Sequence, residues 1–267
     1  MSDKGFTETM VPVGELSVDR QVQRSTVDFR KVERLKKTWN PNAAGLIVVS
    51  QRNAVDKIVI DGMHRYLAYA QLTDNQGEML AQVFTGLSLE EEAQLFLDTN
   101  YGNQPTLLDK FRVRVVARDD VAVSVNRMVR AYGWDISNNA ANGNVSAVGA
   151  LERIYKIGEA LELEPHLLQS TIMVITHAWG QERGGAQAVI LEGIAALIAE
   201  NDVNLDLKRL ETALKTYPGG PLGLHTDATS LAALKQGKVS MAVAIQVTDH
   251  YNKGRKTRTL SPWRRHR

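Results

Sequence analysis

The stretch from residue 57 to residue 70 limits the possible folds of this chain more than any other. It starts with the apolar, β-branched run of residues 58–60, turns at Asp61-Gly62, and then places apolar residues at helical spacing from Met63 onward. This order predicts a strand, a tight turn and the start of a helix. We therefore expect a sheet with helices packed on it.

The flanking pattern extends this α/β unit over residues 1–104. Strands are predicted at residues 10–18, 46–49, 57–60 and 80–86, the first at a sheet edge because Pro12 lacks a donor. Helices are predicted at residues 29–39, from Met63, and from a capping box at Ser88 and Glu91 through Asp98. The apolar face expected on the first helix consists of Phe29, Val32, Leu35 and Trp39.

Beyond Pro105 the pattern changes to helical spacing only. Gly- and Asn-rich loops at residues 137–144 and 180–185 separate the helices. A Pro-Gly-Gly-Pro loop at residues 218–221 precedes a final helix that is expected to run to about Tyr251. The sequence thus predicts an α+β protein with three parts, which are an α/β domain at 1–104, an all-helical domain at 105–251 and a basic tail at 252–267.

The turn at Asp61-Gly62 has the composition of an anion-binding site. Glycine lets the backbone approach a phosphate closely, and the first N–H groups of a helix lack partners within the helix. His64 and Arg65 would project from this helix start and add positive charge. The alternative is that Asp61 caps the helix and Arg65 is an ordinary surface cation, and the residue types leave both open.

The composition narrows the chemistry. There is no cysteine, which excludes disulfides, thiolate metal sites and cysteine nucleophiles and fits a reducing cytoplasm. The N-terminus has no signal-peptide pattern and no apolar run is long enough for a membrane span, so we expect a cytoplasmic protein without membrane contact. The six histidines show no metal-binding spacing, so no metal ligands are identified.

The net charge of +2 hides a strong asymmetry. Residues 1–249 hold 25 Lys/Arg and 30 Asp/Glu, whereas the last 18 residues hold seven cations and no acid. Such a tail neutralises phosphates and predicts salt-dependent DNA binding. The alternatives are a solubilising terminus or a tether to the acidic body. The cations are Lys253, Arg255, Lys256, Arg258, Arg264, Arg265 and Arg267.

Three short motifs occur in the order and spacing of a known superfamily. Val22-Gln23-Arg24 stands where a Gln-Pro-Arg triplet is expected, and residues 61–65 (Asp-Gly-Met-His-Arg) stand where Asp-Gly-Gln-His-Arg is expected. Residues 95–100 match a Leu-Phe-x-x-x-Asn pattern. Over residues 10–118 the chain resembles the ParB/sulfiredoxin-like superfamily, and more closely its phage ParB-like, DGQHR-type nuclease-domain proteins. Met63 occupies the cysteine position of sulfiredoxins, which excludes their sulfur chemistry.

This resemblance implies a nucleotide or phosphate pocket. A nucleoside triphosphate with Mg²⁺ is the candidate cofactor, and the alternative is that the protein has none. Thr99 and Asn103 replace a Glu and an Arg of the second motif of ParB nucleotide-binding proteins, which weakens the case for hydrolysis. The pocket residues implied are Gly62, Met63, His64, Arg65, Arg24 and Asn100.

Helices predicted at residues 106–118, 120–132 and 146–158 could form a DNA-reading element of the helix-turn-helix kind. The linker at 133–145 is longer than the usual tight turn, so an ordinary helical bundle with solvated arginines is the alternative. The arginines that would contact DNA are Arg112, Arg114, Arg118, Arg127 and Arg130.

Two classes of function remain. The first is a DNA-binding, ParB-like regulatory or partition-type protein with a phosphate pocket, located in the bacterial host cytoplasm if phage-encoded. The second is an enzyme on the same fold, which would be a nuclease, nucleotide hydrolase or phosphotransferase of phage DNA metabolism or modification. In the enzyme, His64 would be the general base and Asp61 or Asp98 would supply a carboxylate. The alternative for His64 is a capping or structural role. A homodimer is left open.

Overall fold

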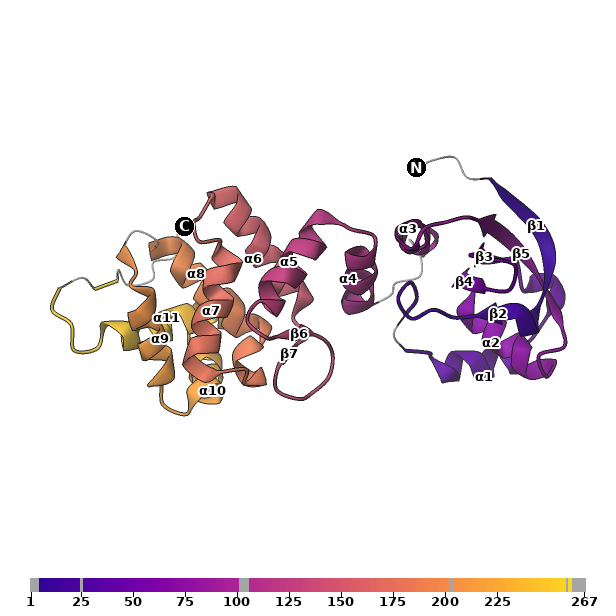
Figure 1. The fold of residues 1–267 in the computed structure, drawn as a ribbon. Coiled ribbons are helices and arrows are strands. Elements are labelled where there is room, and N and C mark those ends of the chain that lie inside the picture. Colours follow the sequence, from indigo (N-terminus) through magenta and orange to yellow (C-terminus); the bar gives the residue numbers. More distant parts are fainter. Residues whose placement is uncertain (1–4, 25, 101–105, 202–203, 258, 261–267) are drawn as a thin grey trace. The chain divides into compact units, whose positions relative to one another are not determined.

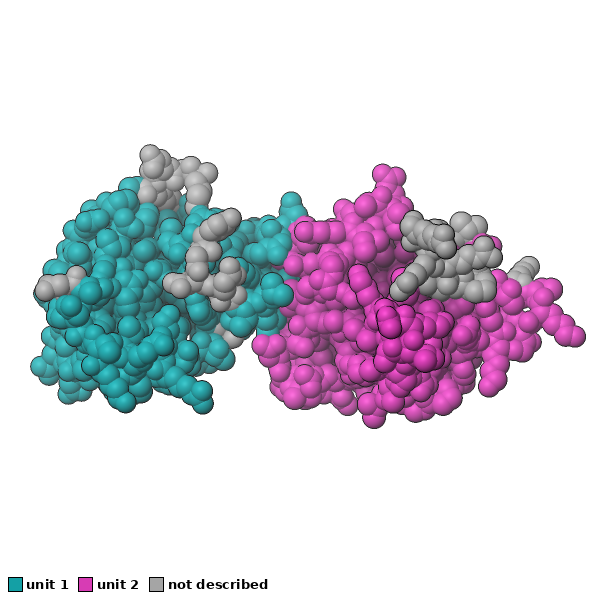
Figure 2. All heavy atoms as spheres, turned by 180° about the vertical axis from the view of Figure 1, so that it is seen from behind, with its two compact units in different colours: residues 1–120 teal, residues 121–267 magenta. Residues whose placement is uncertain are grey.

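The computed structural model describes residues 5–24, 26–100, 106–201, 204–257 and 259–260. Its internal contacts divide the chain into two compact units, residues 1–120 and residues 121–267 (Figure 2). The protein is a mixed α and β structure, as the sequence predicts at that level.

The first unit is built on a five-stranded mixed sheet (Figure 1). Its strands are β1 (Phe6–Pro12), β2 (Leu16–Ser17), β3 (Ile47–Gln51), β4 (Lys57–Asp61) and β5 (Glu78–Thr85), in the spatial order β1-β5-β3-β4-β2. The β1–β5 and β3–β4 pairs are antiparallel, and β3–β5 and β2–β4 are parallel. The single strand predicted at 10–18 is two strands, one at each edge, because the 3-10 turn η1 (Val13–Glu15) separates them.

Helices cover both faces of this sheet, because successive residues of a strand point to opposite sides. Ile47 and Val49 join one core with residues of α2 (Met63–Leu72), on which α1 (Phe29–Lys37) packs, whereas Val48 faces α3 (Leu89–Thr99) and α4 (Leu107–Val116). The short 3-10 turn η2 (Pro41–Ala43) precedes β3. The predicted capping box of α3 is present, with Ser88 and Glu91 bonded to each other's backbone.

Two details of this unit differ from the sequence expectation. Helix α4 packs on α3 and places Val113 in the same core as Val48, so the first unit extends to residue 120 rather than ending at 104. Phe29, expected on the buried face of α1, is 65% exposed. Helix α1 packs mainly on α2 alone, and a helix with one neighbour buries only a narrow stripe of side chains.

The second unit is formed mostly by helices. The Asn- and Gly-rich loop also contributes a short parallel ribbon, β6 (Asp135–Ile136) with β7 (Asn144–Val145), which the helix-only prediction did not include. The helices are α5 (Asp120–Arg130), α6 (Val148–Leu161), α7 (Leu167–Trp179), η3 (Arg183–Ala186), α8 (Ala188–Asn201), α9 (Leu207–Lys215), α10 (Gly220–Lys235) and α11 (Val239–Asn252).

Helix α8 lies at the centre of this unit, against α6, α7 and α11. Its buried residues lie on several sides, as is typical of an internal helix. At Gly193 an added Cβ would lie 2.5 Å from the Ser240 carbonyl oxygen, so glycine permits the close approach of α11. Among the helices of the described residues, none combines the length and apolar character needed to cross a membrane.

The C-terminal region also differs from expectation. The single final helix is two helices, α10 and α11, because Gln236 adopts a left-handed conformation with φ of 49° and ends α10. The first part of the basic tail folds back on α11. Leu260 is 2% exposed, and its backbone N–H and carbonyl both bond the Asn252 side chain at 2.8 Å.

Candidate phosphate-binding site

A hollow of about 190 Å³ lies in the first unit at the start of α2. It contains every residue that the sequence assigned to the phosphate pocket, although these residues come from distant parts of the chain. The residues that line it are Gln23, Arg24, Lys31, Leu35, Asp61, Gly62, Met63, His64, Arg65 and Asn100.

Gly62 sets the position of the helix start. It has a φ of 92°, and an added Cβ would lie 2.5 Å from the Cγ2 atom of Ile47, so a side chain has neither the conformation nor the space. No side chain caps α2. The first N–H groups of the helix have no acceptor within it, and the residues that carry them, 63–65, line the hollow.

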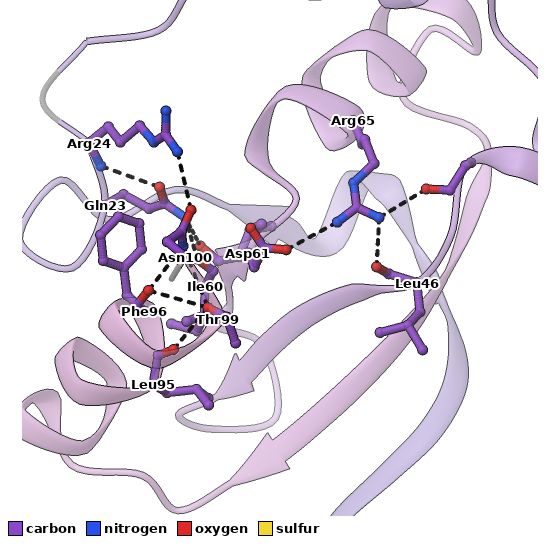
Figure 3. Close-up of polar contacts among 12 residues, drawn as sticks. Gln23, Arg24, Leu46, Ile60, Asp61, Arg65, Leu95, Phe96, Thr99 and Asn100 are labelled. Atoms are coloured by element: carbon purple, nitrogen blue, oxygen red, sulfur yellow. Dashed lines mark hydrogen bonds and ion pairs between the residues drawn. The ribbon is translucent and has the colours of Figure 1, made fainter. Parts of the chain in front are cut away.

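Arg65 is held by three contacts rather than standing as a surface cation (Figure 3). Its Nη1 donates to the carbonyl oxygens of Ala44 and Leu46 at 2.9 and 2.8 Å, and its Nη2 lies 3.1 Å from Asp61. Asp61 is thus the ion-pair partner of Arg65 and not the cap of α2. Together they join the turn after β4 to the segment before β3.

His64 is buried, with 8% of its surface exposed. Its Nε2 accepts a hydrogen bond from the Asp28 N–H at 3.2 Å, and Asp28 caps α1 by accepting from the Lys31 N–H. The pKa of His64 is lowered by burial and then by the charges of Lys31 and Arg24, while Asp28 acts in the opposite direction. Neutral His64 carries its proton on Nδ1, since Nε2 is the acceptor.

Arg24 and Asn100 meet on the other side of the hollow (Figure 3). Arg24 Nη2 donates to Asn100 Oδ1 at 3.2 Å, and Asn100 Nδ2 donates to the Phe96 carbonyl at 3.0 Å, so Asn100 is fixed at the end of α3. The Gln23 side chain donates to the carbonyls of Val59 and Ile60 and accepts from the Arg24 N–H. This places Arg24 beside the end of β4.

Sequence reasoning missed three lining residues. Gln23 carried a signal, since it belongs to the Val-Gln-Arg triplet, but its role in holding β4 depends on a contact with distant backbone. Lys31 and Leu35 face the hollow from α1. Nothing in the sequence separates Lys31 from the other cations of that helix, because the docking of α1 decides which one faces the hollow.

The charges around this hollow favour an anion. Arg65 and Asp61 offset each other, whereas Arg24 and Lys31 add positive charge that lowers the pKa of His64. The volume suits a phosphate group and is below the range of about 300–1,000 Å³ for whole ligands. Within the described ranges, no three His, Cys, Asp or Glu side chains gather as metal ligands would.

The predicted arginine cluster is distributed over both units. Arg112, Arg114 and Arg118 belong to the first and Arg127 and Arg130 to the second, so the helix-turn-helix candidate spans the unit boundary at α4 and α5. Three of these arginines pair with acids, which reduces the charge offered to DNA. The pairs are Arg114 with Asp119 at 2.7 Å, Arg118 with Glu90 at 2.6 Å and Arg130 with Asp135 at 2.8 Å.

Part of the predicted basic tail is also engaged. The guanidinium of Arg255 lies 5.2 Å from the centre of the Tyr251 ring, and that of Arg209 lies 5.1 Å from it. Lys253 and Lys256 are exposed. The remaining tail cations, Arg258, Arg264, Arg265 and Arg267, lie outside the described residues.

A comparison with family models gives one match. Residues 18–260 match the model described as a family of unknown function (DUF6551), and the chain belongs to this family. The match includes all the residues that line the hollow and ends at the buried Leu260. No curated protein sequence matches the chain.

Proposed function

We propose that this member of the DUF6551 family binds a phosphate group of a nucleotide or of DNA in the hollow at the start of α2. We also propose that its first unit is a ParB-like domain, on the basis of the three motifs that resemble that superfamily. The protein would then be a DNA-binding protein of regulatory or partition type. The observation that carries the proposal is the convergence of Arg24, Lys31 and the uncapped start of α2 on one small polar hollow.

Each of these groups has a defined part in binding. The N–H groups of α2 would donate to phosphate oxygens, and Arg24 and Lys31 would neutralise the charge. A hydrogen bond between charged groups contributes about 1.5–3 kcal/mol, so two cations and a helix start are enough for measurable affinity. Arg65 would act mainly by holding Asp61 and the segment before β3 in place.

The size of the hollow limits how a nucleotide would bind. A volume of about 190 Å³ accommodates a phosphate but not a base and sugar, which would lie outside. Asp61 is the only carboxylate among the described lining residues, and it pairs with Arg65. Mg²⁺ normally needs several oxygen ligands, so it would enter with a triphosphate rather than be held by these side chains.

The enzyme alternative has one observation in its favour. The lowered pKa of His64 keeps its imidazole neutral at pH 7, as a general base requires. However, its Nε2 already accepts from the Asp28 N–H, and Asp61 is paired with Arg65. Because both proposed catalytic groups already have structural contacts, we favour binding over hydrolysis.

The experiment compares the phosphate affinity of variants at cations that line the hollow with that of a variant at a neighbouring cation that does not. Isothermal titration of the full chain with inorganic phosphate, and with a nucleoside triphosphate with and without Mg²⁺, gives the affinity. Lys31→Gln and Arg24→Gln should each weaken binding about tenfold or more. Arg30→Gln is the matched control, since Arg30 is exposed on the same helix and does not line the hollow. Unchanged affinity in folded Lys31→Gln and Arg24→Gln would reject the site.

A further inference from the structure

We propose that the helical unit has its own binding site for an organic phosphate of about mononucleotide size. The site is a hollow of about 660 Å³ beside β7, η3 and the starts of α6 and α8. It shares no residue with the hollow at the start of α2. The residues that line it are Asn144, Ser146, Ala147, Arg183, Gly184, Ala186, Gln187, Ala188, Val189 and His225.

The side chains of this hollow favour an anion. Arg183, which is exposed, and His225, which is half-buried, come from η3 and α10, and Asn144, Ser146 and Gln187 add neutral polar groups. None of the ten described lining residues is acidic, although the body of the chain has more acids than bases. The carboxylate of Glu182 lies near Gly184, but Glu182 does not line the hollow.

The two Asn- and Gly-rich loops form its frame and are bonded to each other. The Gly143 N–H donates to the Gln181 carbonyl at 2.8 Å, and the Arg183 N–H donates to the Asn142 side chain at 3.1 Å. The Asn144 side chain donates to two carbonyls of its own loop. The backbone around the hollow is therefore fixed before any ligand arrives, which lowers the entropic cost of binding.

The N-termini of two helices also favour an anion in this hollow. Ala188 and Val189 are the first residues of α8, and Ala147 precedes α6, which has no side-chain cap. The positive ends of two helices of fourteen residues thus lie at the hollow, in addition to Arg183 and His225.

The size of this hollow is that of a site for a small ligand. The volume is within the range of about 300–1,000 Å³ typical of small-molecule sites. Phosphate would bind near Arg183 and the α8 start. The neutral donors and acceptors of Asn144, Ser146 and Gln187 would contact the sugar or base, which predicts tighter binding of a nucleotide than of free phosphate.

The test is hydrogen–deuterium exchange of the full chain with adenosine monophosphate, inorganic phosphate or a short DNA duplex. We expect adenosine monophosphate to protect residues 181–190, and free phosphate to do so only at higher concentration. Arg183→Gln should weaken this protection about tenfold or more, and His225→Gln should weaken it less. Lys215→Gln, an exposed cation of α9, is the control and should change it less than twofold.

Three results would overturn the proposal. The first is absence of protection at 181–190 with millimolar nucleotide, and the second is protection by the DNA duplex alone. The third is protection that survives Arg183→Gln combined with His225→Gln but is lost in Lys31→Gln, since this would assign the ligand to the hollow at α2. Loss in Arg183→Gln with normal binding in Lys31→Gln supports the second site even if the first is rejected.

Discussion

The two hollows of this protein are held in different ways. In the first unit the side chains are themselves fixed, since Arg65 and His64 bond backbone groups of other segments and Asn100 bonds the Phe96 carbonyl of its own helix. In the second unit the backbone is fixed by bonds between loops, and Arg183 lines the hollow with an exposed side chain. A small hollow with fixed groups selects for a defined group such as phosphate, whereas a larger one with a fixed frame accommodates a more varied ligand.

The two units also differ in the contacts that stabilise them. The first unit adds a buried polar contact to its two apolar cores, because Glu92 in α3 is fully buried and forms an ion pair with Arg52, which also bonds Asp19. The second relies on close apolar packing, as at Gly193 between α8 and α11. This difference can be tested by changing one support at a time.

The largest effect is expected at the buried ion pair. Arg52→Gln should lower the free energy of unfolding of the first unit by about 2–4 kcal/mol, because it leaves the Glu92 carboxylate buried without its cation. Chemical denaturation measures this loss. Arg30→Gln is the control and should change stability by less than about 0.5 kcal/mol. An equal effect of the two variants would show that polar contacts do not support this unit.

A smaller loss is expected in the second unit. Gly193→Ala should cost about 1–3 kcal/mol, because the added Cβ would lie 2.6 Å from Val243 as well as close to the Ser240 carbonyl. Gly5→Ala adds the same group where no atom lies within 4 Å and should be nearly neutral. Thermal unfolding compares them, and a stabilised Gly193→Ala would contradict the close packing of α8 on α11.

The role of the basic tail in DNA binding is tested better by a truncation that starts at residue 261 than by one that starts at 252. Leu260 is part of the packed structure, so the longer deletion would also disturb the fold. Deleting residues 261–267 removes Arg264, Arg265 and Arg267. If these cations contact DNA, the log–log salt slope of binding should fall by about 0.9 for each. Fluorescence anisotropy with a labelled duplex at several salt concentrations gives the slope. An unchanged slope would place DNA contact elsewhere.

The smallest expected effect is on how the free energy of unfolding depends on pH. The pKa of His64 is below its ordinary value of 6.5 in the folded chain, so the unfolded chain takes up the proton first. The stability that neutral His64 provides is present above pH 6.5 and is lost as the pH falls through that value toward the lowered pKa. His64→Gln, whose amide oxygen reaches about as far as Nε2 and can accept from the Asp28 N–H, should flatten this decline in urea denaturation between pH 7 and pH 5. Parallel curves for both proteins would contradict it.

Local patterns predicted much of the first unit. The strands at β3, β4 and β5, the start of α2 and the capping box of α3 all follow from residues close together in sequence. The docking of α4 on α3 could not be predicted, because the burial of Val113 depends on a surface formed elsewhere. The break between α10 and α11 depends on a left-handed Gln236, a conformation that glutamine seldom signals in sequence.

The sequence predicted which residues form the candidate site but not which groups they bond. The motifs identified Arg24, Gly62, His64 and Asn100, all of which line the hollow. The engagement of Arg65 with backbone carbonyls could not be predicted, because a carbonyl has no residue-specific signature. For the same reason the sequence overstated the arginine cluster, since partners such as Glu90 are recognised only in the fold.

A crystal structure of the full chain grown with a nucleoside triphosphate tests the central claim most directly. We predict a phosphate group within hydrogen-bond distance of the first N–H groups of α2, with Arg24 and Lys31 at its oxygens and the Arg65–Asp61 pair intact. Phosphate density elsewhere in the protein, with the α2 hollow filled by water alone at saturating nucleotide, would contradict the proposal.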